Sequence, residues 1–125
     1  MRVEIITTGA ELLTGVQPET NSLFLSGELL ALGLETAFKT TVGDDEQDLE
    51  KALHQAMART EAVILTGGIG PTEDDITRKV IAKVARKRLV LNDDALKALH
   101  ARLAQLNKPV ATVQDRQALI PAGAR

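Results

Sequence analysis

The chain has 125 residues, 44% hydrophobic and 26% charged, and its 15 lysines and arginines against 17 aspartates and glutamates give a net charge of −2. This near balance argues against a nucleic-acid-binding protein, and the hydrophobic fraction argues against a disordered chain. The absence of cysteine excludes disulfides, thiolate metal sites and cysteine nucleophiles. No apolar stretch approaches the ~20 residues that cross a bilayer, and Glu4 and Glu11 interrupt any signal-peptide-like run. We therefore expect a cytoplasmic protein with one domain over residues 1–125.

The first strand is predicted at Val3–Thr8 and ends at Gly9. A helix follows from about Asn21, which can cap it, to Leu32, and Gly33 stands where a glycine commonly ends a helix. Its buried side is predicted from the spacing i, i+4, i+7 of Leu25, Leu29 and Leu32.

The second strand is predicted at Leu34–Val42, and Asp44 or Asp45 begins the next helix. The apolar face of that helix is predicted to comprise Leu49, Ala52, Leu53, Ala56 and Met57. The third strand, Ala62–Thr66, is continuously apolar, which is typical of a strand covered on both faces in a parallel sheet.

The second half of the chain predicts a helix at 75–86, an apolar run at 89–91 and a helix that begins at Asn92 or Asp93. A short helical piece is expected at 114–118. Leu119 and Ile120 read as the approach to a further strand, so we expect a chain truncated at its C-terminal end. Alternating strands and helices predict an α/β fold: a three-layer α/β/α arrangement with a mainly parallel sheet and the first strand between the other two.

Ligands of open α/β sheets bind beyond the carboxyl ends of the strands, where three loops of this chain combine glycine with acidic residues. The acids are Glu11 in the first loop, Asp44 and Asp45 in the second, and Glu73, Asp74 and Asp75 in the third. Any one of them can be a helix cap or a solvated loop residue, and we expect one aspartate of each pair to be a cap. Three acidic loops at one edge nevertheless favour a divalent metal ion such as Mg²⁺ or Mn²⁺.

The stretch 66–77, Thr-Gly-Gly-Ile-Gly-Pro-Thr-Glu-Asp-Asp-Ile-Thr, joins a predicted strand to a helix. Its three glycines let backbone N–H groups approach a ligand, and a helix N-terminus favours an anion. The stretch is neither a Walker A loop nor a dinucleotide fingerprint. We expect a bound anion or nucleotide against 67–72.

Other chemistry finds little support in the sequence. His54 and His100 lie in predicted helices, and Ser22 and Ser26 have no neighbouring histidine, which argues against a Ser-His-Asp triad. A basic set at helical spacing predicts a solvated helix face, formed by Arg78, Lys79, Lys83, Arg86 and Lys87.

Several motifs together resemble one family: Gly9-Ala-Glu-Leu-Leu-x-Gly15, Asn21, Val42-Gly-Asp-Asp45, the stretch 66–77 and Gln117-Ala-Leu-Ile-Pro-x-Gly-Ala124. They are similar to the N-terminal domain of CinA, the competence/damage-inducible protein, which is related to the molybdopterin-binding domain of MogA- and MoaB-type enzymes. The resemblance spans nearly the whole chain and departs locally at Ala10. It implies a metal-dependent ADP-ribose pyrophosphatase that yields AMP and ribose 5-phosphate. It also implies a family domain that continues beyond Arg125 into a further strand and loop.

With this resemblance, Asp44 and Asp75 are the predicted catalytic and metal-binding residues, and Glu11 completes the metal shell or contacts a ribose. The predicted substrate-binding residues are Gly9, Glu11, Asn21, Gly67, Gly68, Gly70, Pro71, Thr72, Asp74 and Thr77. Two alternatives stay open: molybdopterin binding or adenylylation, and a non-catalytic binding or oligomerisation module. The expected partners are an ADP-ribose-like nucleotide or a pterin and a second copy of the chain, with no membrane and no nucleic acid.

Overall fold

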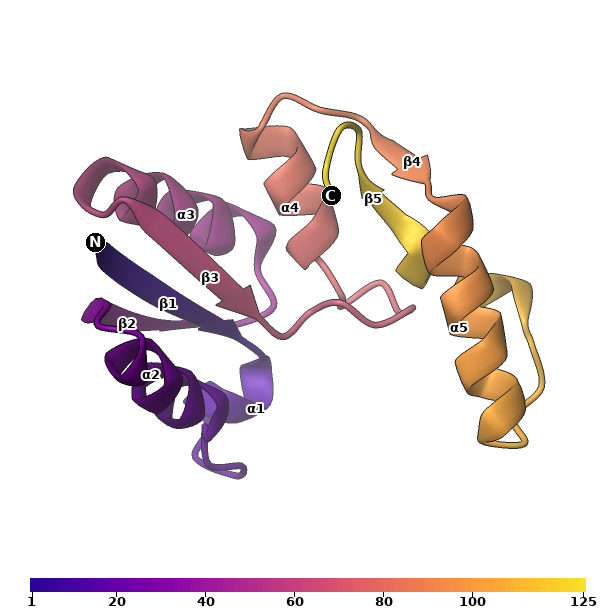
Figure 1. The fold of residues 1–125 in the computed structure, drawn as a ribbon, viewed down its shortest axis with the longest axis horizontal. Coiled ribbons are helices and arrows are strands. Elements are labelled where there is room, and N and C mark those ends of the chain that lie inside the picture. Colours follow the sequence, from indigo (N-terminus) through magenta and orange to yellow (C-terminus); the bar gives the residue numbers. More distant parts are fainter. The chain divides into compact units, whose positions relative to one another are not determined.

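The computed structural model describes residues 1–125 as two compact units, Met1–Gly68 and Ile69–Arg125. Figure 1 shows the elements of both. The first unit contains β1 (Arg2–Thr8), α1 (Ala10–Leu13), α2 (Asn21–Ala31), β2 (Glu35–Val42), α3 (Glu46–Arg59) and β3 (Ala62–Thr66). The second contains α4 (Thr77–Val84), β4 (Leu89–Leu91), α5 (Asp93–Gln105), the 3₁₀ helix η1 (Thr112–Ala118) and β5 (Leu119–Pro121). Every helix is too short or too polar to span a bilayer.

The sheet of the first unit has the strand order β2-β1-β3, and both pairings are parallel. The predicted strand order and direction are therefore confirmed. Thr7 of β1 lies opposite Thr41 of β2 and Thr66 of β3, so the three strands reach the same edge with their carboxyl ends. The loops that follow β1, β2 and β3 leave from this edge.

The central strand β1 is buried on both faces. Val3 and Ile5 form a core cluster with Leu29 of α2, and the side chains packed against this cluster are Leu25, Leu34, Ala62 and Ile64. On the other face, α3 contributes the buried Leu49, Leu53 and Ala56. Figure 1 shows α2 and α3 on opposite faces of the sheet, which is the predicted three-layer arrangement.

Three burial predictions are wrong in detail. Every residue of β3 is only partly buried, because β3 is an edge strand with β1 as its single neighbour. Leu32 is 74% exposed, since it lies past the last residue of α2 as its C-cap. Met57 is 56% exposed and extends past the buried side of α3.

A buried acid that the sequence did not reveal joins three elements of the first unit. Glu4 of β1 is fully buried and accepts hydrogen bonds from Arg59 Nε (2.8 Å) and Nη2 (2.7 Å) and from Thr40 Oγ1 (2.6 Å). The Arg59 guanidinium also lies 3.9 Å from the centre of the Phe38 ring. The hydrogen bonds from Arg59, with that from Thr40, outweigh burial and lower the pKa of the Glu4 carboxyl. Glu4 therefore stays ionised inside the protein.

In the second unit, β4 and β5 pair antiparallel, with Val90 opposite Ile120. Leu119–Pro121, read from the sequence as the approach to a further strand, is itself a strand. The predicted helix at 75–86 is shorter at both ends, because α4 begins at Thr77 and ends at Val84. The helix predicted to begin at Asn92 or Asp93 is confirmed as α5, and Asn92 caps it by accepting the Ala95 N–H at 2.8 Å.

Candidate functional site

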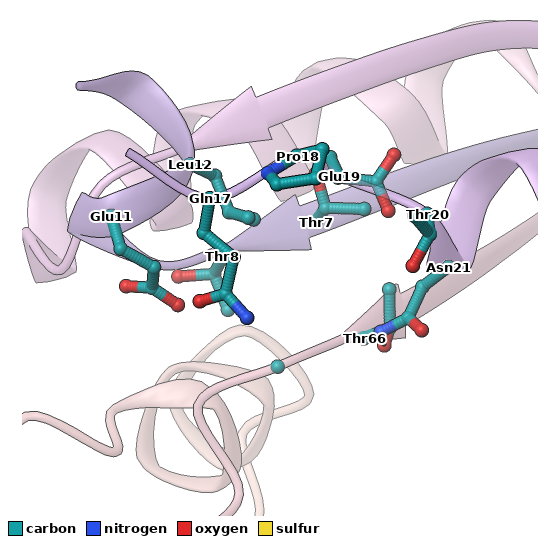
Figure 2. Close-up of a pocket in the computed structure, with 11 residues that line it drawn as sticks. Thr7, Thr8, Glu11, Leu12, Gln17, Pro18, Glu19, Thr20, Asn21 and Thr66 are labelled. Carbon is teal, nitrogen blue, oxygen red and sulfur yellow. Dashed lines mark hydrogen bonds between the residues drawn. The ribbon is translucent and has the colours of Figure 1, made fainter. Parts of the chain in front are cut away.

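A cleft of about 190 Å³ lies in the first unit, where β1 and β3 end. Figure 2 shows side chains from β1, α1, the following loop, the start of α2 and the end of β3 around it. The lining residues are Thr7, Thr8, Glu11, Leu12, Gln17, Pro18, Glu19, Thr20, Asn21, Thr66 and Gly67. Three predicted site residues, Glu11, Asn21 and Gly67, are among them. Sequence reasoning did not single out the polar residues around them: Thr7, Thr8, Gln17 and Glu19 lie outside the motifs, and Thr66 belongs to the stretch 66–77 but was not predicted as a site residue.

One end of the cleft is organised by the start of α2. Asn21 Nδ2 donates to Thr66 Oγ1 at 3.0 Å, which links α2 to the end of β3. Asn21 is not the helix cap that the sequence predicted: the cap position is Thr20, and the Glu19 carboxylate accepts the Ser22 N–H at 2.7 Å and the Ser22 hydroxyl. The Asn21 side chain is therefore directed to the cleft instead of to the helix backbone.

The Glu19 carboxyl is half-buried, and its ionisation follows from these contacts. Burial alone would raise its pKa, but the hydrogen bonds from the Ser22 hydroxyl and from the Ser22 and Asn21 backbone, together with the charge of Lys39, outweigh burial and lower it. Glu19 is thus an ionised acceptor in the cleft wall.

The floor of the cleft is held by threonines and by close backbone packing. Thr7 and Thr8 are buried; the Thr7 hydroxyl is hydrogen-bonded to that of Thr41 at 2.9 Å, and Thr8 Oγ1 donates to the Gly43 carbonyl at 3.2 Å. Gly67 has φ of 94°, and a Cβ there would overlap the carbonyl oxygen of Thr8. This contact alone requires glycine at 67. The opposite end of the cleft carries the exposed Glu11, as Figure 2 shows.

The two aspartates of the second loop, Asp44 and Asp45, make different contacts. Asp45 caps α3 by accepting the Asp48 N–H at 2.9 Å, which confirms that one aspartate of this pair is a cap. Asp44 is exposed and accepts the Ala10 N–H at 3.3 Å, so it lies beside the start of α1. Gly9, a predicted site residue, is buried and donates to the Val42 carbonyl at 3.0 Å.

In the second unit, the loop before α4 is closed by Asp75. Its Oδ2 accepts the Thr72 N–H at 2.9 Å and the Thr72 hydroxyl at 2.7 Å. Burial alone would raise the pKa of Asp75, but the hydrogen bonds from Thr72 and from the Gly70 backbone, together with the charge of Arg78, outweigh burial and lower it. A Cβ at Gly70 would stand 2.5 Å from this carboxylate, so any other residue there would displace the Asp75 side chain.

Neither aspartate of the third loop caps the helix, contrary to prediction. The cap position of α4 is Ile76, which has no capping side chain, because the helix begins two residues beyond Asp75. Asp74 is exposed, Pro71 is partly buried and Thr77 is buried at the first position of α4.

Arg78 has a different role from the solvated one predicted for it. It is partly buried, and its guanidinium donates to the carbonyl oxygens of Ile69 and Gly70, the latter at 2.6 Å.

Comparison with known proteins fixes the family. Residues 4–122 match the family model described as "Probable molybdopterin binding domain". The chain belongs to this molybdopterin-binding-domain family.

One relative of this chain is a CinA-like protein of Solibacter usitatus. It is 43% identical over 124 residues, which are 99% of this chain and 30% of that protein. The chain thus spans about 30% of the length of the curated relatives that it matches. The CinA structure from Thermoplasma acidophilum matches with a TM-score of 0.89 and 28% identity over 100% of this chain and 73% of that one. A MoaB from Pyrococcus furiosus, called a tungsten cofactor synthesizing protein, matches with a TM-score of 0.65 and 24% identity over 84% and 63%. The resemblance to CinA is confirmed.

A metal ion bound to this chain would need several carboxylates close enough to one another to coordinate it together. Neither unit by itself brings three acidic or histidine side chains together in that way. Asp44 belongs to the first unit and Asp75 to the second, and their pairing on one ion remains a prediction.

Proposed function

We propose that this chain binds a nucleotide and contributes to hydrolysis of the diphosphate bond of ADP-ribose. Water adds to one phosphorus and the bridging P–O bond breaks, which gives AMP and ribose 5-phosphate. The chain spans only part of its relatives, so the activity is proposed for the domain within its longer protein. Dependence on an added divalent cation is part of the proposal.

The observation that carries this proposal is the polar cleft at the carboxyl ends of β1 and β3, the edge where α/β sheets bind ligands. Gly67 belongs both to the cleft and to the glycine-rich stretch that we propose as the phosphate-binding segment. Within that stretch the amides of Gly70 and Thr72 donate to Asp75, and Pro71 has no N–H. The phosphate donor that we propose within the first unit is the amide of Gly68.

The test is incubation of the purified chain, and of a longer protein that contains it, with ADP-ribose and Mg²⁺ or Mn²⁺. Chromatography should show AMP and ribose 5-phosphate in equal amounts, and EDTA should stop their formation. Absence of both products from the longer protein with either metal would contradict the proposal.

A second candidate function is pterin binding, which the family assignment favours. The same cleft would then hold a molybdopterin-type ligand without hydrolysis. Tight binding of a pterin by a protein that leaves ADP-ribose intact would decide for this candidate.

The homo-oligomer predicted from the sequence stays a prediction. In the isolated chain the outer side of α2 carries an exposed apolar surface. It is formed by Leu23, Phe24 and Leu30, each more than 65% accessible to solvent. Sedimentation equilibrium over a range of concentrations would give the oligomeric state. An assembly with no turnover and no ligand binding would favour the non-catalytic module.

A further inference from the structure

The cleft of the first unit has an unusual charge composition for a phosphate-binding site. Its lining includes four threonine side chains, two amides and two carboxylates, and contains no lysine, arginine or histidine. Carboxylates repel a phosphate unless a cation lies between them. The cleft is therefore suited to an uncharged group that donates hydrogen bonds.

The cleft volume also limits what can enter. Pockets that enclose a whole drug-sized ligand measure roughly 300–1,000 Å³. At about 190 Å³ the cleft has room for one sugar ring, not for a whole dinucleotide. The rest of a nucleotide must lie outside it.

The strongest acceptor in the cleft is held in place before any ligand arrives. The Glu19 carboxylate is fixed by the Ser22 N–H and hydroxyl and by the Asn21 N–H, which leaves about one of its four acceptor sites for a ligand. Next to it, Asn21 donates to Thr66, which leaves the Asn21 side-chain oxygen as a second acceptor. Figure 2 shows Glu19, Asn21 and Thr66 at the same end of the cleft.

We propose that this end of the cleft binds the vicinal hydroxyl groups of a ribose, with Glu19 and the Asn21 side-chain oxygen accepting from them. One hydroxyl can donate to the remaining acceptor site of Glu19 and its neighbour to the Asn21 side-chain oxygen, and hydrogen bonds to charged acceptors are the stronger kind. The inference rests on the proposed nucleotide ligand and assigns its ribose to the cleft and its phosphates elsewhere. Glu19 is thereby a specificity-determining residue for ribose over deoxyribose.

The test measures binding without turnover, by titration calorimetry on the whole chain. Two pairs of probes differ by one hydroxyl: AMP against 2′-deoxy-AMP, and ribose 5-phosphate against 2-deoxyribose 5-phosphate. In at least one pair the ribose form should bind about tenfold tighter, and Glu19→Gln should remove most of that difference. Glu28→Gln, on the exposed side of α2, is the matched control and should keep it.

The inference would be overturned if the ribose and deoxyribose compounds bound equally tightly in both pairs. It would also be overturned if Glu19→Gln kept the full preference for the ribose compound. If thermal melting shows that Glu19→Gln is unfolded, Thr66→Val replaces it as the test, because it removes a cleft hydroxyl without removing a charge. Thr66→Val should bind the ribose member of the discriminating pair at least threefold more weakly, and unchanged binding would refute the inference. Hydroxyl-dependent binding without hydrolysis of ADP-ribose would refute the proposed function alone. Hydrolysis with no hydroxyl dependence would refute this inference alone.

Discussion

Replacing Asp75 by asparagine should loosen the loop before α4. The carboxylate accepts from the Thr72 N–H and hydroxyl and is also bonded to the Gly70 backbone. Asparagine keeps one acceptor oxygen, puts an amide donor in place of the other, and removes the charge that strengthens each bond. Losing charge assistance costs roughly 1 kcal/mol per bond, and the loop is partly open to water, so we expect a loss of about 1–2 kcal/mol.

Thermal melting followed by circular dichroism measures this effect. For a chain of 125 residues, a loss of 1 kcal/mol lowers the melting temperature by roughly 4 °C. Asp74→Asn is the matched control: Asp74 is exposed, and exposed substitutions usually change stability by less than about 0.5 kcal/mol. Asp75→Asn melting like the wild type would refute the assignment of Asp75 as the residue that closes the loop.

Three further predictions concern the first unit. Arg59 lowers the folded-state pKa of Glu4 below its ordinary value of 4.5, so ionised Glu4 stabilises the fold above that pH and this stabilisation is lost as the pH falls. The free energy of unfolding in urea should therefore decrease from pH 7 to pH 3. The Glu4→Gln variant should show a smaller decrease. Leu49→Ala should cost about 2–5 kcal/mol in chemical denaturation, because Leu49 is fully buried between α3 and the sheet, and a cost below about 1 kcal/mol would contradict this packing. Asp45→Ala should cost about 1 kcal/mol as the loss of a helix cap, whereas Asp44→Ala should melt like the wild type, and equal melting of the two variants would contradict the capping role.

The order and direction of the strands in the first unit could be predicted from the sequence. Alternating strands and helices predicted parallel neighbours with β1 central, and the register confirms this because each crossover returns beside β1. The continuous apolar run of β3 was misleading about burial. A run of apolar residues reports what a strand can bury, whereas its position at the edge of the sheet determines what it does bury.

The candidate site was predictable by region but less so by residue. Strand ends and glycine loops located the cleft, since ligand sites of α/β sheets follow from topology. The partners of individual side chains did not follow, because they depend on contacts across long separations: Asn21 with Thr66, and Ala10 with Asp44. Arg78 shows the same limit, since a charge at helical spacing gives no sign of whether it turns to solvent or to a loop carbonyl.

The two acidic pairs share a pattern that bears on which carboxylates can serve a ligand. In each pair one aspartate accepts a short backbone hydrogen bond, Asp45 from Asp48 and Asp75 from Thr72. Of the other two, Asp44 accepts the Ala10 N–H at 3.3 Å and Asp74 is exposed. Asp74 is therefore a competitor of Asp75 for the predicted catalytic role. Turnover of ADP-ribose by Asp74→Asn and Asp75→Asn in the longer protein, at saturating divalent cation and below the melting temperature of both, separates the two. Loss of turnover in Asp75→Asn alone supports the role predicted from the motif. Loss in Asp74→Asn alone assigns the catalytic carboxylate to Asp74 and leaves Asp75 as the residue that shapes the loop, and unchanged turnover in both would remove this loop from the proposed chemistry.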